Sequence, residues 1–381
     1  MNNKFKEFFE SEKSGGIVLL IVTLLSILLA NSSYQVTYLE FWTARIGAHS
    51  LIDWINDGLM AIFFLYVGLE LKREVYHGEL SRFTKASLPV IAAIGGMIIP
   101  VLIFMCFNHG TVTRSGAGIP MATDIAFAIG ILSLLGKRVP MSLKIFLTAL
   151  AVIDDLGAIL VIAVFYTSEL SVGYILAVLG IFLILLLLNR MRINHLSPYL
   201  MGGILMWYCM MHSGIHATLS GVLLAFTIPF RDGKKKTPSV KVWHFLHRPV
   251  TFGILPLFAL ANTALVLNER FSQLGQAVSL GIILGLLLGK PLGIGLFSLV
   301  AFKSGFCSLP EGIRMKHIWG AGFLGGIGFT MSIFITLLSF SDPEIVKLSK
   351  MAIICGSILS GIAGYIWLNY TLKSNSLSGG K

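Results

Sequence analysis

The sequence predicts an all-α polytopic membrane protein with about twelve transmembrane helices. Of its 381 residues, 55% are hydrophobic and only 12% are charged, and the mean hydropathy is +0.84. A soluble domain carries about 25% charged residues, so this composition excludes a water-soluble globule. The apolar residues also gather in long runs, and about 20 such residues in a helix cross a hydrocarbon core about 30 Å thick.

Twelve apolar stretches are candidate spans. They cover residues 15–31, 58–69, 86–107, 118–136, 142–166, 171–188, 198–212, 213–229, 252–268, 274–302, 317–340 and 348–372. The first stretch follows a tail with both acids and lysines and is long for a signal peptide, so we interpret it as a retained helix. Cleavage after Ala30 is the alternative. All twelve belong to one transmembrane domain over 1–381.

The basic residues predict the orientation. Alternate loops and both tails hold 23 Lys and Arg, and the other loops hold five. Cytoplasmic loops carry this excess, so both termini are expected in the cytoplasm. The net charge of +11 does not predict a nucleic-acid partner, because no soluble domain carries a basic face. The four cysteines lie far apart, mostly in apolar runs, which favours packing over disulfides or a metal cluster.

Two longer segments lie between spans, 32–56 and the basic loop 230–251. The first is rich in Tyr, Trp and Thr and has strand-like character. One interpretation is a hairpin outside the membrane that makes the contact of a homodimer. The alternative is an ordinary loop.

Spans four and eleven contain residues that interrupt a helix. Span four has Pro120, Thr123 and Asp124, and span eleven has five glycines between 320 and 328. Proline removes a backbone donor and glycine weakens the helix, so both spans are expected to be discontinuous at membrane depth. The alternative is that the glycines only allow close helix packing.

Each interrupted span is the middle member of a three-span group, 86–166 and 274–372. Because of the number of spans between them, the two groups begin on opposite sides of the membrane. This arrangement predicts an inverted-topology repeat. Paired interrupted helices at such a repeat indicate the binding site of a transporter. The two groups would form a core, and spans within 14–76 and 171–268 would form a panel and interface.

Four charged residues lie inside apolar sequence: Asp124, Asp154, Asp155 and Lys290. Charges at membrane depth are costly and are functional candidates by default. Adjacent helical residues point about 100° apart, so Asp154 and Asp155 can face one cavity with different partners. One could offer oxygen to sodium while the other pairs with Lys290. The alternatives are aspartates at a helix end and a lysine that reaches the interface.

A carboxylate neutralised by a cation cannot also hold a proton. A site open alternately to each side would therefore exchange sodium for protons. If two protons move per sodium, the exchange is electrogenic. Asp124 at the break would neutralise the positive ends of half-helices, and Thr123 could add an oxygen for the ion. Nothing in this scheme needs an enzyme activity or a cofactor beyond the transported sodium or lithium and protons.

Several long blocks resemble the NhaA-type sodium–proton antiporters, a family that is itself an example of the inverted-repeat architecture. The blocks are NDGLMAIFFLYVGLELKREV (56–75), IPMATDIAFAIG (119–130), KIFLTALAVIDDLGAI (144–159), HSGIHATLSG (212–221), LLGKPLGI (287–294) and GIGFTMSIFI (326–335). The resemblance implies that Asp155 is the main ion ligand and that Asp154 is the partner of Lys290 and a candidate proton carrier. It places Thr123 and Asp124 at the unwound crossing.

The resemblance also implies sodium export that is activated at alkaline pH. Asp57 would lie on the ion path and affect ion selection. The positions implied in the pH response are Glu70, Glu74, His216, His244 and His247. Histidine titrates near neutrality, which suits this role.

The pH-response positions also have plainer interpretations. The family pattern has an acid before the first histidine of the pair, whereas this chain has Trp243, so the pH profile is less defined than the transport chemistry. Glu70 and Glu74 can also form simple surface ion pairs with Lys72 and Arg73. A polar packing role is the alternative for His216.

Rival functions make different predictions. A sodium-coupled symporter would need a solute pocket. An intramembrane aspartyl protease could share a proton between two aspartates, but its GxGD context is absent and Lys290 would have no role. A passive channel would need no proton exchange.

Overall fold

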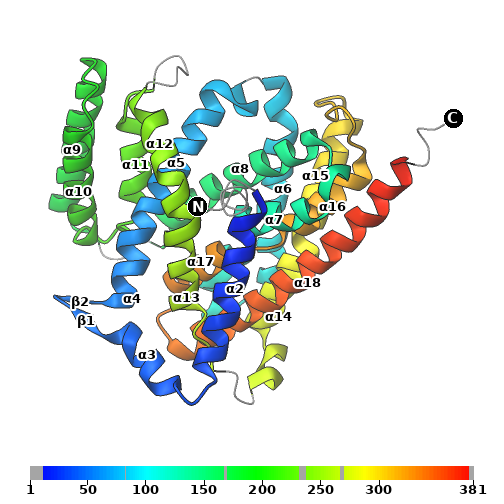
Figure 1. Ribbon diagram of the computed structural model, residues 1–381, viewed down its shortest axis with the longest axis horizontal. Coiled ribbons are helices and arrows are strands. Elements are labelled where there is room, and N and C mark those ends of the chain that lie inside the picture. The colour runs from blue at the N-terminus through cyan, green and yellow to red at the C-terminus, as the bar shows by residue number, and fades with distance from the viewer. Residues whose placement is uncertain (1–11, 82, 167–169, 231–236, 267–269, 377–381) are drawn as a thin grey trace, which may run out of the picture. The chain divides into compact units, whose positions relative to one another are not determined.

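The computed structural model describes residues 12–81, 83–166, 170–230, 237–266 and 270–376 (Figure 1). These residues fold almost entirely into helices. In chain order the longer elements are α2 (Glu12–Ala30), α3 (Gln35–Thr43), β1 (Arg45–Ile46), β2 (His49–Ser50), α4 (Leu51–Asp53), α5 (Met60–His77), α6 (Phe83–Asn108), α7 (Ile125–Leu134), α8 (Met141–Phe165), α9 (Val172–Arg190), α10 (Ser197–Met211), α11 (Leu219–Thr227), α12 (Pro238–Pro249), α13 (Leu255–Asn262), α14 (Ala277–Leu284), α15 (Lys290–Lys303), α16 (Met315–Gly325), α17 (Phe329–Ser339) and α18 (Pro343–Ser376).

Shorter helical turns connect several of these helices. The 3₁₀ turns are η2 (Glu79–Ser81), η3 (Val112–Met121), η4 (Gly136–Arg138) and η6 (Arg270–Gly275), and the π-helical turns are η1 (Trp54–Leu59), η5 (Val250–Ile254) and η7 (Gly285–Gly289). A π turn inserts an extra residue into a helix and is frequent at functional sites. Here η7 ends directly before Lys290, and η1 contains Asp57.

Six helical segments are long and apolar enough to cross a membrane, or up to nine if each bent helix pair counts as one span. The chain is therefore an all-α, multi-pass membrane protein. The predicted spans seven and eight correspond to α10 and α11, which have 15 and nine residues and are shorter than a full crossing helix. The predicted span nine begins in η5 and continues without a break into α13. Twelve spans and the inverted repeat stay predictions.

The two spans expected to be discontinuous are bent. A 44° bend separates η3 from α7 at Ala122–Asp124, and a 49° bend separates α16 from α17 at Gly326–Gly328. Proline, glycine and N-capping residues lie at these points, and each disfavours an unbroken helix there.

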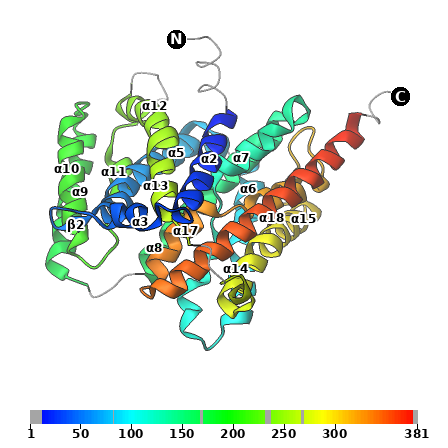
Figure 2. The ribbon, with the colours of Figure 1, turned by 60° about the horizontal axis from the view of Figure 1, so that its bottom comes forward.

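The described chain forms two compact units. Unit 1 comprises Met1–Ile27, Arg82–Ala158 and Leu265–Lys381, and unit 2 comprises Leu28–Ser81 and Ile159–Ala264. In unit 1, α18 packs against α14, α16 and α17, and both views show α14 beside α18 (Figures 1 and 2). In unit 2, α5 packs on α11, and α9 pairs with α10.

Glycines let α6 and α15 of unit 1 approach at backbone distance. A side chain at Gly95 or Gly293 would overlap the carbonyl oxygen of the other. One at Gly289 would meet the Cα atom of Pro100 at 2.8 Å. Small residues at a helix crossing allow this approach, and the crossing holds Lys290 against the rest of the unit.

Unit 2 contains a buried lysine at a helix end. Lys72 of α5 is 6% exposed, and its Nζ donates to the carbonyl oxygens of Ala225 (3.3 Å), Phe226 (3.0 Å) and Ile228 (2.6 Å). These carbonyls lie at the C-terminus of α11, where a helix leaves acceptors unsatisfied and carries partial negative charge. Lys72 thus acts as a C-terminal cap rather than the surface ion-pair partner that the sequence suggested.

The segment 32–56 is mostly helical. It forms α3, followed by a hairpin in which Arg45 pairs with Ser50 and Ile46 pairs with His49. The indole of Trp54 donates to the carbonyl of Ile46, 3.0 Å away, which fixes the hairpin to the start of the next span. The expected hairpin is present, but it is only two residues long on each side.

Candidate ion-binding site

The break in span four is stabilised by Asp124, which caps two helices of unit 1. Its Oδ1 accepts a hydrogen bond from the backbone N–H of Phe127 in the first turn of α7, 3.1 Å away. Its Oδ2 accepts from the backbone N–H of Thr330 (3.2 Å) and from the Thr330 hydroxyl, in the first turn of α17. A carboxylate is stabilised by N–H groups at helix N-termini, so one acid compensates both half-helices.

The backbone also joins the two breaks directly. The N–H of Asp124 donates to the carbonyl of Ile327, 2.6 Å away. The Ser332 hydroxyl of α17 donates to the carbonyl of Ile119 in η3, 2.7 Å away. Interrupted backbone at membrane depth must be satisfied within the protein. These bonds meet that requirement and hold the two breaks together where the interrupted spans cross.

Asp154 of α8 faces the same crossing. Its Oδ2 is 2.5 Å from Lys290 Nζ, and both side chains are completely buried. The Thr123 hydroxyl lies 2.7 Å from the same oxygen and also 2.7 Å from the carbonyl oxygen of Gly325, the last residue of α16. A hydroxyl has one proton, so Thr123 donates to only one of these two acceptors at a time.

The other carboxylate oxygen of Asp154, Oδ1, has no hydrogen-bond partner within the described part of the chain. A buried acceptor without a donor is costly, and such exceptions mark functional positions or bound ions. Asp155, the next residue of α8, is 4% exposed. The two adjacent aspartates are therefore both buried, with Asp154 paired to Lys290.

The donor types suit a hard cation. No group of three or more His, Cys, Asp or Glu that could hold a metal ion occurs among the described residues. The crossing instead offers carboxylates, hydroxyls and the ends of interrupted helices, which are oxygen ligands of the kind that hard cations take.

The other predicted residues belong to unit 2. Asp57 lies in η1, where its backbone carbonyl accepts from the Trp207 indole at 3.3 Å. The neighbouring Asn56 Oδ1 accepts from Asn262 Nδ2 of α13 at 2.8 Å. His216 lies between α10 and α11 and is half-buried.

The predicted pH-response residues other than His216 lie on α5 and α12, which pack against each other. Arg73 donates to Glu74 (2.9 Å), and its guanidinium carbon lies 4.2 Å from the centre of the Trp243 ring. Trp243 stacks on Tyr66, whose hydroxyl lies 3.0 Å from His247 Nδ1. Trp243 thus binds Arg73 through a cation–π contact where the family pattern has an acid.

The two histidines and Glu70 lie in this region too. His244 is exposed, and its ring lies edge-on to Trp243. Partial burial and then the positive charges of His244, Arg248 and Arg73 lower the pKa of His247 below its ordinary value of 6.5. Glu70 is half-buried on α5, one helical turn before Glu74.

Comparison with known proteins gives one consistent result. The family model described as Na+/H+ antiporter 1 matches residues 6–368. The Na(+)/H(+) antiporter NhaA 1 of Flavobacterium johnsoniae is 60% identical over 376 residues, covering 98% of this chain and 99% of the relative. The Na(+)/H(+) antiporter NhaA of Dechloromonas aromatica is 55% identical over 381 residues, covering 99% and 98%. The chain belongs to the Na+/H+ antiporter 1 family.

Membership of the Na+/H+ antiporter 1 family agrees with the resemblance inferred from the sequence blocks. The family is one of transporters. Sequence reasoning did not identify Thr330 or Ser332, although both hydroxyls contact the crossing. Their signal was present in GIGFTMS, where polar residues directly follow the glycine-rich break, but their partners lie more than 200 positions earlier.

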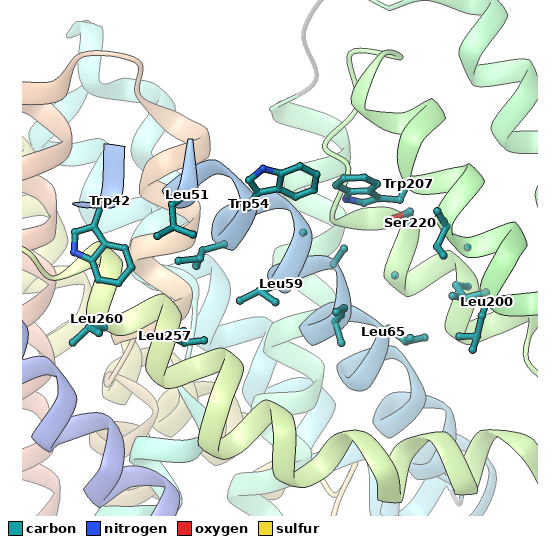
Figure 3. Close-up of a pocket in the computed structure, with 18 of the residues that line it drawn as sticks. Trp42, Leu51, Trp54, Leu59, Leu65, Leu200, Trp207, Ser220, Leu257 and Leu260 are labelled. Carbon is teal, nitrogen blue, oxygen red and sulfur yellow. The ribbon is translucent and has the colours of Figure 1, made fainter. Parts of the chain in front are cut away.

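One cavity of this member of the Na+/H+ antiporter 1 family lies apart from the candidate ion site. It lies within unit 2, has a volume of about 980 Å³, and contains none of the predicted ion ligands (Figure 3). Trp54 and Trp207 stack at one side, and most of the remaining lining is aliphatic. Such a lining offers no ligand set for a cation.

Proposed function

We propose that this chain is an electrogenic sodium (lithium)/proton antiporter that exports cytoplasmic sodium in exchange for protons. The observation that carries the proposal is Asp154. It is fully buried, its Oδ2 contacts Lys290 and Thr123, and its Oδ1 lacks a partner among the described residues. This carboxylate lies where two interrupted helices meet, which is the position of the ion site in inverted-repeat transporters.

Competition for Asp154 and Asp155 would couple the two ions. Asp155 is the main cation ligand, with Asp154 and Thr123 adding oxygens, and protons occupy the carboxylates when sodium leaves. A buried carboxylate is costly as a bare charge, so one neutralising partner replaces another. Lys290 holds Asp154 between these events.

The Thr123 hydroxyl supports this exchange chemically. While Asp154 is ionised, Thr123 can donate to its Oδ2. When Asp154 takes a proton, the hydroxyl can donate to the carbonyl of Gly325 instead. Neither state leaves the hydroxyl proton without an acceptor, which lowers the cost of changing the charge on Asp154.

Transport would proceed by alternating access. The groups 86–166 and 274–372 act as the moving core and the remaining spans as the panel. Two protons per sodium would move net charge, and a membrane potential contributes about 2.3 kcal/mol per charge per 100 mV. Asp57 lies on the ion path at the start of the second span.

Alkaline activation would arise at the cytoplasmic cluster. Glu70, Glu74, His244 and His247 respond to pH there, with His216 contributing near α11. The cluster contains Arg73 on the Trp243 ring. In this proposal the chain lies in the bacterial inner membrane with both termini in the cytoplasm and forms a homodimer through 32–56.

Inverted vesicles with a pH dye test this proposal across a pH series. Sodium addition should dissipate an imposed proton gradient, and the rate should be higher at alkaline pH. Because the exchange moves net charge, its rate should change when the membrane potential is clamped at a different value. Asp155→Asn should abolish the response, Glu74→Gln should mainly move its pH dependence, and Asp342→Asn, an exposed loop acid, should behave as wild type. No sodium-dependent proton movement at any pH would remove the proposal.

A further inference from the structure

Helix α18 contributes two buried hydroxyls to the break between α16 and α17. Ser357 and Ser360 lie three residues apart, so they share one face of the helix. The Ser360 Oγ donates to the carbonyl of Phe323, in the last turn of α16, 2.7 Å away. The Ser357 Oγ accepts from the backbone N–H of Phe329, the first residue of α17, 3.2 Å away.

These bonds satisfy both sides of the interruption. The last carbonyls of a helix and the first N–H groups of the next have no partner within their own helices. In the membrane no water replaces such partners. Ser357 supplies the acceptor for the Phe329 N–H. Ser360 adds a second donor to the Phe323 carbonyl, which also accepts from the backbone N–H of Gly326, 3.0 Å away. Ser360 is fully buried and Ser357 is 6% exposed. A side chain at Gly326, inside the break, would overlap both the Ser360 hydroxyl and the Leu286 carbonyl.

Each serine is one short step from the ion site. Phe323 lies two residues before Gly325, whose carbonyl accepts from Thr123 beside Asp154. Phe329 directly precedes Thr330, which donates twice to Asp124. A change at one end of the break therefore shifts a direct contact of a predicted site residue.

Ser360 also lies near the element that carries the lysine. Its Oγ is 3.4 Å from the carbonyl of Leu286, in the π turn η7 that ends before Lys290. The shorter bond, to Phe323, takes the single hydroxyl proton, and Leu286 remains the alternative acceptor. One hydroxyl thus lies between the end of α16 and the turn before Lys290.

We infer that Ser357 and Ser360 are positioning residues for ion exchange. They hold the two ends of the α16–α17 break in place, and through Gly325 and Thr330 they set the positions of Thr123 and Asp124. This inference rests on the proposed antiport function. It predicts that losing either hydroxyl changes ion affinity and pH dependence, and not only the amount of folded protein.

The test uses Ser360→Ala and Ser357→Ala in the full chain, reconstituted in vesicles. Ser349→Ala is the matched control, since Ser349 lies on the same helix, is fully buried, and its Oγ has no partner among the described residues. Ser360→Ala and Ser357→Ala should each raise the apparent KM for sodium about tenfold and move the pH midpoint of sodium–proton exchange. Ser349→Ala should leave both quantities unchanged.

Hydrogen exchange provides a second measurement. Backbone amides of residues 320–332 should exchange hydrogen faster in Ser360→Ala and Ser357→Ala than in Ser349→Ala. The reason is that each of the first two variants removes a hydrogen-bond partner from one end of the α16–α17 break. If one variant does not fold, the other answers the question. The positioning role alone would be overturned if the wild type transports sodium and protons but Ser357→Ala and Ser360→Ala both match Ser349→Ala. The match would have to hold for the KM for sodium, the pH midpoint of transport and the rate of amide hydrogen exchange. An inactive wild type would instead overturn the antiport function.

Discussion

The buried Asp154–Lys290 ion pair carries a high desolvation cost. A buried ion pair costs desolvation energy that its own attraction only partly returns. Removing one partner leaves the other as an uncompensated buried group. The pair is therefore better explained by chemistry than by stability, because well-packed apolar residues would hold the same helices together at lower cost.

Lys290→Ala tests this residue-scale argument. It should lower the free energy of unfolding by about 3–5 kcal/mol, because Asp154 loses its counter-charge. The double variant Lys290→Ala with Asp154→Asn should recover part of that loss, since no buried charge is then left alone. Thermal unfolding of the purified variants measures both, and a double variant less stable than Lys290→Ala would contradict the argument.

His247 predicts a pH dependence of stability. Its lowered pKa means that, as the pH falls below 6.5, the unfolded chain takes a proton before the folded chain does. Stability should therefore fall with pH in that window, until the folded imidazole is also protonated. His247→Gln should make the dependence shallower in thermal-shift measurements between pH 5 and 7, with His195→Gln as control. Identical slopes would refute the assignment.

The four charged residues of the apolar runs were predictable because each is unusual where it stands. The partners of Asp124 were not, because Thr330 lies 206 positions away and its hydroxyl is ordinary in composition. The Trp243 contact with Arg73 was also beyond the sequence, which showed only that the expected acid was missing. Pairings of distant, common side chains need the tertiary structure.

Elements show the same division. Pro120 and the glycines predicted where spans four and eleven break, since these residues disfavour helix wherever they occur. The π turns were not predicted, because GLLLG and WINDGL are compatible with ordinary helix. The caps of the breaks were likewise hidden, as they come from other helices.

The α6–α15 crossing gives an element-scale prediction. A methyl group at Gly293 would overlap the carbonyl of Gly95, so Gly293→Ala should destabilise the fold by about 1–3 kcal/mol. Gly180→Ala is the control, because a Cβ atom there meets nothing within 4 Å and alanine favours the helix. Thermal unfolding should show a loss for the first variant and none for the second. Equal melting temperatures for Gly293→Ala and Gly180→Ala would contradict the argument that α6 and α15 need this close approach.

At the scale of the whole molecule, composition and loop charge carried the most information. Hydropathy alone indicated a multi-pass helical protein, because lipid admits few other folds. The number of crossings was harder to predict, since α10 and α11 are too short for a length criterion, and bent pairs can be counted as one span or two. Orientation rests on the 23 to five excess of basic residues.

Fusion reporters test that orientation. A fluorescent protein that folds only in the cytoplasm should fluoresce when fused after Lys381, and alkaline phosphatase, which is active only outside, should be active after Arg45. Moving the phosphatase to the basic loop at Lys241 should remove its activity. The reverse pattern would place both termini outside and invert the direction of transport.

Proton release on sodium binding tests the central claim most directly, since it needs neither a membrane nor a gradient. Purified protein in weakly buffered detergent solution, at a pH where exchange is active, is mixed with sodium chloride while a dye records the pH. We predict that sodium acidifies the solution in proportion to the protein, that choline chloride does not, and that Asp155→Asn abolishes the signal. Saturable sodium binding by the wild type with no proton release would contradict the account.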